Sequence, residues 1–186
     1  MNDIIRTCQD LYSIAKSSLS VVNGNWCIIT NMIIKANTSD FNTVKDITQT
    51  TIKAVYPRYY PQGAVELFVN HHSDENISSD ISSGLIYLLN IDGRNVGTVT
   101  VKENHINRLF VLPDCQHKGY GRELMDFAED LVFQTYDTCE LDSSLPAKKI
   151  YLKRGYEESS YNILETENGD YLCFDIMIKN KDRDLI

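Results

Sequence analysis

The sequence has no excess of basic residues and no hydrophobic run long enough to cross a membrane. Its 186 residues include 18 Lys and Arg against 26 Asp and Glu, a formal net charge of −8. Proteins that bind nucleic acid need a basic face to neutralise phosphates, so we expect no nucleic-acid partner. The longest apolar run, Leu85 to Leu89, is far shorter than the roughly 20 residues of a membrane-spanning helix. We therefore expect no membrane partner.

Cysteine clusters are also lacking. The cysteine count is odd, the five residues are widely spaced and no Cys-x-x-Cys pair occurs: Cys8, Cys27, Cys115, Cys139 and Cys173. A disulfide framework or a zinc site requires paired or clustered cysteines, so we expect neither a metal site nor disulfides. Asp3, Arg6 and Asp10 interrupt the N-terminal sequence, which is atypical of a signal peptide. These features favour a reducing, cytoplasmic location.

The rest of the composition is that of a globular protein, with 42% hydrophobic and 24% charged residues. The length predicts one domain. An acidic protein could attract a cationic amine through its field, although an acidic surface that keeps the protein soluble is the simpler interpretation. No internal repeat or low-complexity tract interrupts the pattern.

The hydrophobic pattern divides the chain into three parts. Apolar residues at helical spacing over residues 4–19 predict an amphipathic helix, so residues 1–31 are expected to form an N-terminal helical extension. Met32 offers an alternative start, so that residues 1–31 are either a true extension or the result of a mis-set start. A true extension would pack on its own domain or on a second subunit. The domain itself is predicted over residues 32–180, with a frayed tail at 181–186.

Within the domain, periodicity and turn signals predict the order β-α-α-β-β-β-α-β-α-β-β. This order indicates an α/β (α+β) fold, in which a mixed, mostly antiparallel sheet carries helices on both faces. The expected elements are a strand at 32–36, helices at 38–55 and 61–72, a polar connection at 73–80, strands at 85–90, 96–102 and 106–112, a helix at 119–135, a strand at 138–142, a short helix ending at Gly155, and a hairpin over 160–178.

The most informative stretch joins the strand at 106–112 to the helix that follows. Its pattern is Val111-x-Pro113, then Gln116-x-x-Gly119-x-Gly121. Free backbone N–H groups at a helix N-terminus, beside glycines that allow close approach, can hold a pyrophosphate. The alternative interpretation is an ordinary strand-to-helix loop with glycines for a tight turn.

A second motif follows downstream, Ala147-x-x-x-Tyr151-x-x-x-Gly155-Tyr156. Together the two motifs resemble those of the GNAT superfamily of N-acetyltransferases, and the resemblance covers roughly residues 32–178. It implies a GNAT fold and acetyl-CoA (coenzyme A) as cosubstrate. Family members often have arginine in place of Gln116 and asparagine in place of Ser144. The cofactor-binding residues implied by the resemblance are Leu109, Phe110, Val111, Gln116, His117, Lys118, Gly119, Tyr120, Gly121, Arg122 and Ser144.

The resemblance also implies roles for these positions. The backbone of residues 109–111 would pair with the pantetheine amides as an added strand would, and the N–H groups of residues 117–122 would hold the pyrophosphate. Tyr151 would be the catalytic general acid that protonates the departing thiolate. Alternatively, Tyr151 only packs or donates a hydrogen bond to the sulfur.

The general base and the acceptor stay open. An amine must lose a proton during attack, and the candidate bases are Glu103, His105, Glu140 or a water chain. The predicted reaction is direct acetyl transfer in a ternary complex to a primary amine, with a small molecule as the first choice of acceptor. The alternatives are a protein N-terminus or lysine, and a non-catalytic acyl-CoA-binding module.

The region around Tyr56–Tyr60 and His71-His72 corresponds to the acceptor side in the family. A wide groove between this region and the hairpin at 160–171 would favour a peptide acceptor, whereas a closed pocket would favour a small amine. Dimers are common among similar proteins, so the resemblance is also compatible with a homodimer.

Overall fold

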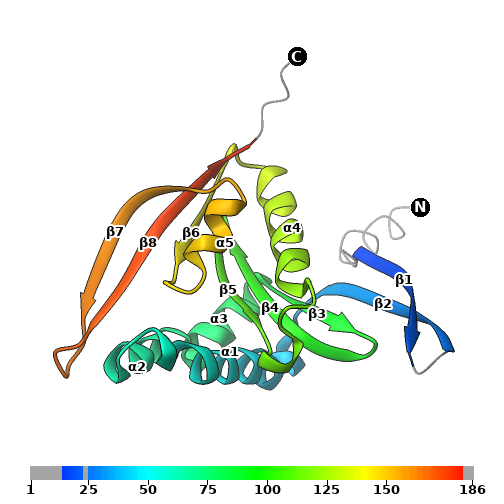
Figure 1. Cartoon of the computed structure of the whole chain (residues 1–186), viewed down its shortest axis with the longest axis horizontal. Helices are drawn as coiled ribbons and strands as arrows, with labels where there is room; N and C mark the ends of the chain where they lie inside the picture. The colour runs from blue at the N-terminus through cyan, green and yellow to red at the C-terminus, as the bar shows by residue number, and fades with distance from the viewer. Residues whose placement is uncertain (1–13, 23–24, 182–186) are drawn as a thin grey trace, which may run out of the picture.

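The computed structural model describes residues 14–22 and 25–181, which build one eight-stranded sheet with the order β1-β2-β3-β4-β5-β6-β8-β7 (Figure 1). Neighbouring strands pair antiparallel except β5 and β6, which are parallel. The sheet is therefore mixed and mostly antiparallel, as predicted. The strands are β1 (Ile14–Val22), β2 (Asn25–Lys35), β3 (Ile86–Ile91), β4 (Arg94–Lys102), β5 (His105–Val111), β6 (Thr138–Ser143), β7 (Glu157–Glu165) and β8 (Tyr171–Asn180).

Helices cover both faces of the sheet. Two consecutive residues of β5 show this, because successive strand residues point to opposite faces. The Phe110 ring faces Tyr56, just after α1, with ring centroids 6.3 Å apart, whereas the Val111 side chain faces Gly121 in α4. The helices are α1 (Phe41–Val55), α2 (Gln62–His71), α3 (Asp74–Ser82), α4 (Tyr120–Phe133) and α5 (Lys148–Lys153), with 3₁₀ turns at Thr38–Asp40, Tyr56–Arg58 and Pro113–Cys115.

Apolar residues at helical spacing explain the two longest helices. In α1 the residues Val44, Ile47 and Ile52 are buried, and in α4 Leu124 and Ala128 are buried. This spacing places them on one side of each helix, where they pack against the sheet. None of the helices in the described part of the chain combines the length and apolarity needed to span a membrane.

The prediction of a helix over residues 4–19 is wrong for those of its residues that the structure describes. Residues 14–22 form β1, which pairs antiparallel with β2; residues 1–13 lie outside the described part. The sequence signal that was missed is Asn23-Gly24 between two runs rich in β-branched residues, a dipeptide typical of hairpin turns. β2 begins at Asn25 and runs through position 32 without interruption. The division of the chain at residue 32 stays a prediction.

The polar connection expected at residues 73–80 is also wrong, because helix α3 begins there. The Ser73 hydroxyl caps the helix by accepting a hydrogen bond of 3.3 Å from the Asn76 N–H. Ile77 and Ile81, four residues apart, are buried against the core. Two apolar residues in a polar stretch were too few to indicate a helix from periodicity alone. The helix is stabilised by its packing against α1, which the sequence pattern does not show.

Candidate active site

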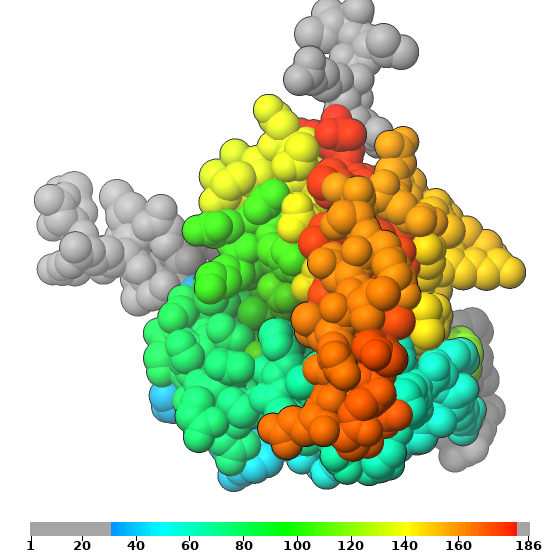
Figure 2. Space-filling view, turned by 90° about the vertical axis from the view of Figure 1, so that its left-hand side faces the viewer, coloured from blue at the N-terminus to red at the C-terminus, as the bar shows by residue number. Residues whose placement is uncertain are grey.

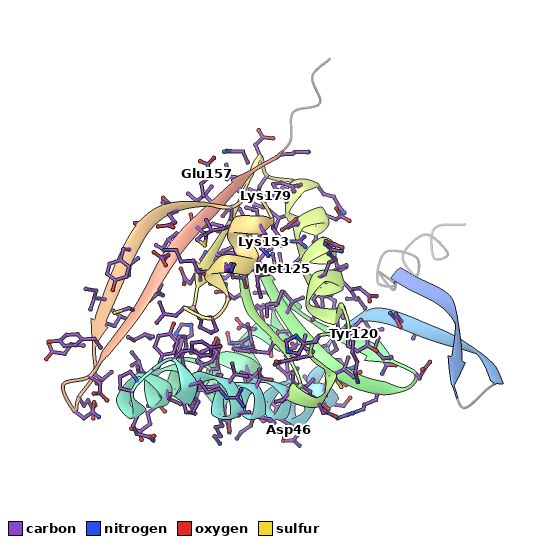
Figure 3. The ribbon with its side chains drawn as sticks, in the orientation of Figure 1. Asp46, Tyr120, Met125, Lys153, Glu157 and Lys179 are labelled. Carbon is purple, nitrogen blue, oxygen red and sulfur yellow. The ribbon has the colours of Figure 1, made fainter. Side chains whose placement is uncertain are left out.

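A cleft opens where the parallel strands β5 and β6 diverge. Their register pairs His105 with Glu140 and Ile106 with Leu141, and it ends there among the described residues. Beyond Ile106 the edge of β5 is left without a neighbouring strand on this side. The cleft has a volume of about 890 Å³, within the roughly 300–1,000 Å³ of small-molecule sites. Figure 3 labels Met125 of α4 and Lys153 of α5, which both line it.

A β-bulge in β5 accompanies this divergence. Thr98 of β4 pairs with Phe110 and Thr100 pairs with Asn107, so β5 carries one extra residue between the two pairs. Arg108 lies in the bulge with φ of 46°, in the left-handed region. A bulge bends its strand and increases the local twist, and the pairing of β5 with β6 ends just before it, at Ile106. Sequence reasoning missed this bulge because strand pairing, not local sequence, creates it.

The glycine loop leads into the N-terminus of α4 beside the free edge of β5. Its chain reverses through His117 and Gly119, with φ of 63° and 89°. The first helical bond runs from the Glu123 N–H to the Gly119 carbonyl at 3.1 Å. The N–H groups of Tyr120, Gly121 and Arg122 therefore have no acceptor within the helix.

The structure leaves room for a pyrophosphate at this loop. A Cβ added at Gly119 would meet no atom within 4 Å, and one added at Gly121 would meet only Val111, at 3.9 Å. The space over both residues is therefore open, so an anion can approach the free N–H groups. Acetyl-CoA bound there would supply an activated acetyl thioester. The pyrophosphate cradle predicted from the sequence stays a prediction, and the geometry of the loop is compatible with it.

Most of the predicted cofactor-binding residues lie around the cleft. Three of them, Lys118, Gly119 and Tyr120, belong to the loop and the start of α4 but do not line it. The predicted residues that do line it are Leu109, Phe110, Val111, Gln116, His117, Gly121, Arg122, Ser144 and Tyr151.

Gln116 fastens the loop to the end of β5. Its side-chain Nε2 donates a hydrogen bond of 3.0 Å to the Val111 carbonyl. The Thr51 hydroxyl lies 3.2 Å from the same oxygen, but its single proton has a closer acceptor in the Ile47 carbonyl at 2.7 Å. The glutamine amide is thus occupied in positioning the loop, a role that an arginine could also fill by donation. The Gln116 bond fixes the point where the strand ends and the glycine loop begins.

Tyr151 lies in the short helix α5 and reaches the cleft from the β6 side. The residue is buried, with its ring edge-on to Tyr156 at 5.7 Å between centroids. Burial raises the pKa of the Tyr151 hydroxyl well above its ordinary value, so the phenol stays protonated at neutral pH and is able to donate. Ser144 is also buried and lines the cleft, as does Tyr56.

None of the three candidate bases from the sequence lines the cleft. Glu103 is exposed in the turn between β4 and β5. His105 lies between two carboxylates, with Nδ1 3.4 Å from Glu140 Oε1 and Nε2 3.8 Å from Asp142 Oδ2. Asp142, which was not predicted, is the one carboxylate among the described residues that line the cleft. Its signal was its position two residues after Glu140, on the same face of the strand.

A buried polar cluster lies at the wall of the cleft that β5 and the end of α2 form. Arg108 Nη1 donates to Asp80 Oδ2 at 2.7 Å and to the Thr100 hydroxyl at 2.9 Å, and Arg108 Nε donates to His72 Nδ1 at 3.3 Å. Both Arg108 and His72 line the cleft. The sequence marked His72 as an acceptor-side candidate, but it gave no indication of its partner.

A strand edge without a neighbour leads into a helix N-terminus with free N–H groups, and a buried tyrosine lines the same cleft. These features fit an acyl-CoA-dependent transferase. The chain belongs to the GNAT acetyltransferases, because the model of the acetyltransferase (GNAT) domain matches residues 55–169. It is thus an acetyl-CoA-dependent N-acetyltransferase. The predicted family, enzyme class and cosubstrate are confirmed.

Solved structures share the fold. A GCN5-related N-acetyltransferase from Rhodopseudomonas palustris is similar with a TM-score of 0.73 and 23% identity, covering 80% of this chain and 94% of that one. The ribosomal-protein-S18-alanine N-acetyltransferase from Escherichia coli gives 0.62 and 19%, covering 84% and 99%. N-acetylglutamate synthase from Neisseria gonorrhoeae, complexed with coenzyme A and N-acetyl-glutamate, gives 0.61 and 20%, covering 82% and 35%. No curated protein matches the sequence.

Proposed function

We propose that this enzyme transfers the acetyl group of acetyl-CoA to the primary amine of a small molecule. The observation that carries the proposal is the contact of the β7–β8 hairpin with α2 on the acceptor side of the cleft. The hairpin reaches from the sheet to the N-terminus of α2 (Figures 1 and 2). There the Gly63 N–H donates a hydrogen bond of 2.9 Å to Asp170 Oδ2. A carboxylate at a helix N-terminus is favourably placed, so the contact is a stabilising one.

Two hydrogen bonds of Tyr60 join three segments on the same side of the cleft. The Tyr60 hydroxyl accepts a hydrogen bond of 2.7 Å from the Leu145 N–H and donates one of 3.3 Å to the Cys173 carbonyl. It thereby joins the loop after α1 to the loop before α5 and to β8. A peptide chain would need a continuous groove between these segments. Their mutual bonds favour a small acceptor over a peptide.

The residues around the cleft suggest how the chain promotes the transfer. The free edge of β5 and the N-terminus of α4 bind and orient the cosubstrate, leaving the acetyl end near Tyr151. Tyr151 donates a hydrogen bond, and then a proton, toward the sulfur that departs. Asp142, backed by His105, accepts the proton that the amine loses, directly or through a water. The amine attacks the thioester carbonyl without a covalent enzyme intermediate.

The test is a free-thiol release assay with acetyl-CoA and a panel of amino acids, aminoglycosides, polyamines and short peptides. We expect release that depends on a small amine. Release with peptides alone would replace the proposal with a peptide acetyltransferase. No release with any acceptor, together with thermal stabilisation by acetyl-CoA, would instead favour a non-catalytic binding module.

A further inference from the structure

His72 is held at the wall of the cleft by partners that fix its orientation. It follows the last residue of α2 and is only 7% exposed. Its ring lies edge-on to Phe110 of β5, at 5.4 Å between centroids. One ring nitrogen, Nδ1, receives the hydrogen bond of 3.3 Å from Arg108 Nε. With Nδ1 engaged, only the Nε2 side of the ring is available to a ligand in the cleft.

Arg108 determines which nitrogen of His72 carries the proton. A guanidinium can only donate, so Nδ1 must offer its lone pair and the proton must lie on Nε2. Arg108 is itself fixed by Asp80 and Thr100, so this arrangement is rigid. Burial, with the Arg108 charge next, lowers the pKa of His72 to about 3. The imidazole is therefore a neutral donor and not a base at physiological pH.

The charges around the cleft restrict what the acceptor can be. Among the described residues that line it, Asp142 is the one carboxylate, whereas five are arginine or lysine. Three of these five, Arg58, Arg122 and Lys153, make no ion pair with another described residue. A polyamine carries several positive charges and would need several carboxylates. The cleft offers one, which suits a single amino group.

The acceptor side is otherwise apolar. Aromatic and aliphatic side chains from the loop after α1, from α2, and from the β7–β8 hairpin form its wall: Tyr56, Tyr59, Leu67, Phe68, Leu164, Leu172 and Phe174. Arg58 lies on the same side, exposed, and a guanidinium pairs well with a carboxylate. The wall therefore matches a ligand with an apolar body and an anionic or carbonyl group.

We propose that the acceptor is an amine with an apolar body and a carbonyl or carboxylate oxygen near the amino group, and that His72 is the residue that recognises this oxygen through Nε2–H. This is the chemistry of an apolar amino acid. The inference rests on the proposed acetyl transfer to small amines and names the class of amine. His72 thereby becomes a specificity-determining residue, with Arg108 and Asp80 as the residues that position it.

The test compares matched acceptors in the thiol-release assay. Leucine and phenylalanine are measured against isoamylamine and phenethylamine, which lack only the carboxylate, and against leucinamide, spermidine and a leucine-initiated tripeptide. The wild-type enzyme is expected to prefer the amino acids to the decarboxylated amines in kcat/KM by at least about tenfold, as expected for a site whose buried donor would otherwise stay unpaired. Retained preference for leucinamide would show that a carbonyl oxygen suffices, whereas its loss would assign the recognition to a carboxylate.

Two variants then assign the preference to His72. His72→Phe removes the donor and should raise KM for the amino acid about tenfold while leaving KM for the decarboxylated amine unchanged. His72→Gln retains an N–H at a similar position and should restore KM to within about threefold. KM for acetyl-CoA and the melting temperature of each variant report whether the fold is intact.

The outcomes separate this inference from the function on which it rests. Equal use of amino acids and decarboxylated amines, a preference for spermidine, or an equal KM increase for both acceptors in His72→Phe would overturn the role of His72 while small-molecule transfer stands. Transfer to the tripeptide alone would overturn the small-molecule function and this inference with it.

Discussion

The N–H of Gly63, in the first turn of α2, donates a hydrogen bond of 2.9 Å to the carboxylate of Asp170 in the turn between β7 and β8. Positions 107 residues apart in the sequence are thus joined at one end of the cleft. The contact places the hairpin against the helix that carries the acceptor side. We propose that this contact limits the size of the acceptor that enters the cleft.

A methyl group at Gly63 tests the contact between α2 and the β7–β8 hairpin. A Cβ there would collide with the Asn168 side chain at the hairpin tip. In an exposed helix interior, alanine would stabilise relative to glycine by about 1 kcal/mol. We predict the opposite sign for Gly63→Ala: a lower melting temperature and a higher acceptor KM, with acetyl-CoA affinity unchanged. Asp170→Asn, which keeps an acceptor oxygen, is the milder control. An increase in melting temperature in Gly63→Ala would contradict the contact.

Tyr151→Phe tests the acid. Removing the hydroxyl takes away a proton donor, and general acid catalysis contributes about 10²–10⁴-fold. We predict a kcat reduced by about 10²-fold or more and a KM for acetyl-CoA within about threefold of wild type. Steady-state kinetics with a saturating amine measures both. An unchanged kcat would assign Tyr151 to packing against Tyr156.

Asp142→Asn tests the base. Asp142 lines the cleft, whereas Glu103 is exposed in a turn away from it. We predict that Asp142→Asn lowers kcat/KM for the amine by about tenfold or more and that Glu103→Gln has no effect. His105→Ala should give an intermediate loss, because His105 contacts Asp142 from behind. The pH profile of kcat/KM for each variant is the measurement. Normal activity in Asp142→Asn would leave proton removal to water.

Gly121→Ala tests the cradle with little risk to the fold. An added Cβ would lie 3.9 Å from Val111, an ordinary contact, within a helix where alanine is favoured. We predict an unchanged or higher melting temperature together with a KM for acetyl-CoA raised about tenfold, because the methyl group occupies space beside the free N–H groups. Thermal unfolding and kinetics are measured on the same sample. An unchanged KM would move the cosubstrate away from this turn.

The buried histidine makes stability depend on pH. The pKa of His72 is about 3 in the folded protein against an ordinary 6.5, so below pH 6.5 the unfolded chain binds the extra proton and the folded chain does not. The contribution of neutral His72 to the free energy of unfolding is therefore fully present above about pH 6.5. It declines as the pH falls toward 3, by up to about 1.4 kcal/mol per pH unit. We predict that His72→Gln loses less stability than wild type between pH 7 and pH 4 in urea unfolding. Parallel curves for the two proteins would show that folding does not lower the pKa of His72.

The sequence predicted those parts of the site that depend on local chain geometry. Gly119 and Gly121 follow a strand and open a helix, and the helix N-terminus lies where that pattern indicates. Tyr151 was placed by its motif and reaches the cleft. Local patterns of this kind need no knowledge of the rest of the fold.

The missed features arise from contacts between distant segments. The bulge at Arg108 exists because β4 and β5 pair with one residue out of step, and Arg108 meets His72 and Asp80 only after α2 and α3 pack on the sheet. Asp142 reaches the cleft because β6 leaves β5 after two paired residues. The strand β1 was hidden because its apolar residues also fitted a helical spacing.

The most direct test of the account is a competition experiment with acetyl-CoA labelled in the acetyl group. Equal concentrations of a leucine-initiated tripeptide, spermidine and leucine are incubated with the enzyme, and the acetylated products are separated by mass spectrometry. We predict that most of the label appears on leucine and that Tyr151→Phe abolishes most of this product. Label on the tripeptide alone, or no labelled product while acetyl-CoA still stabilises the protein, would contradict it.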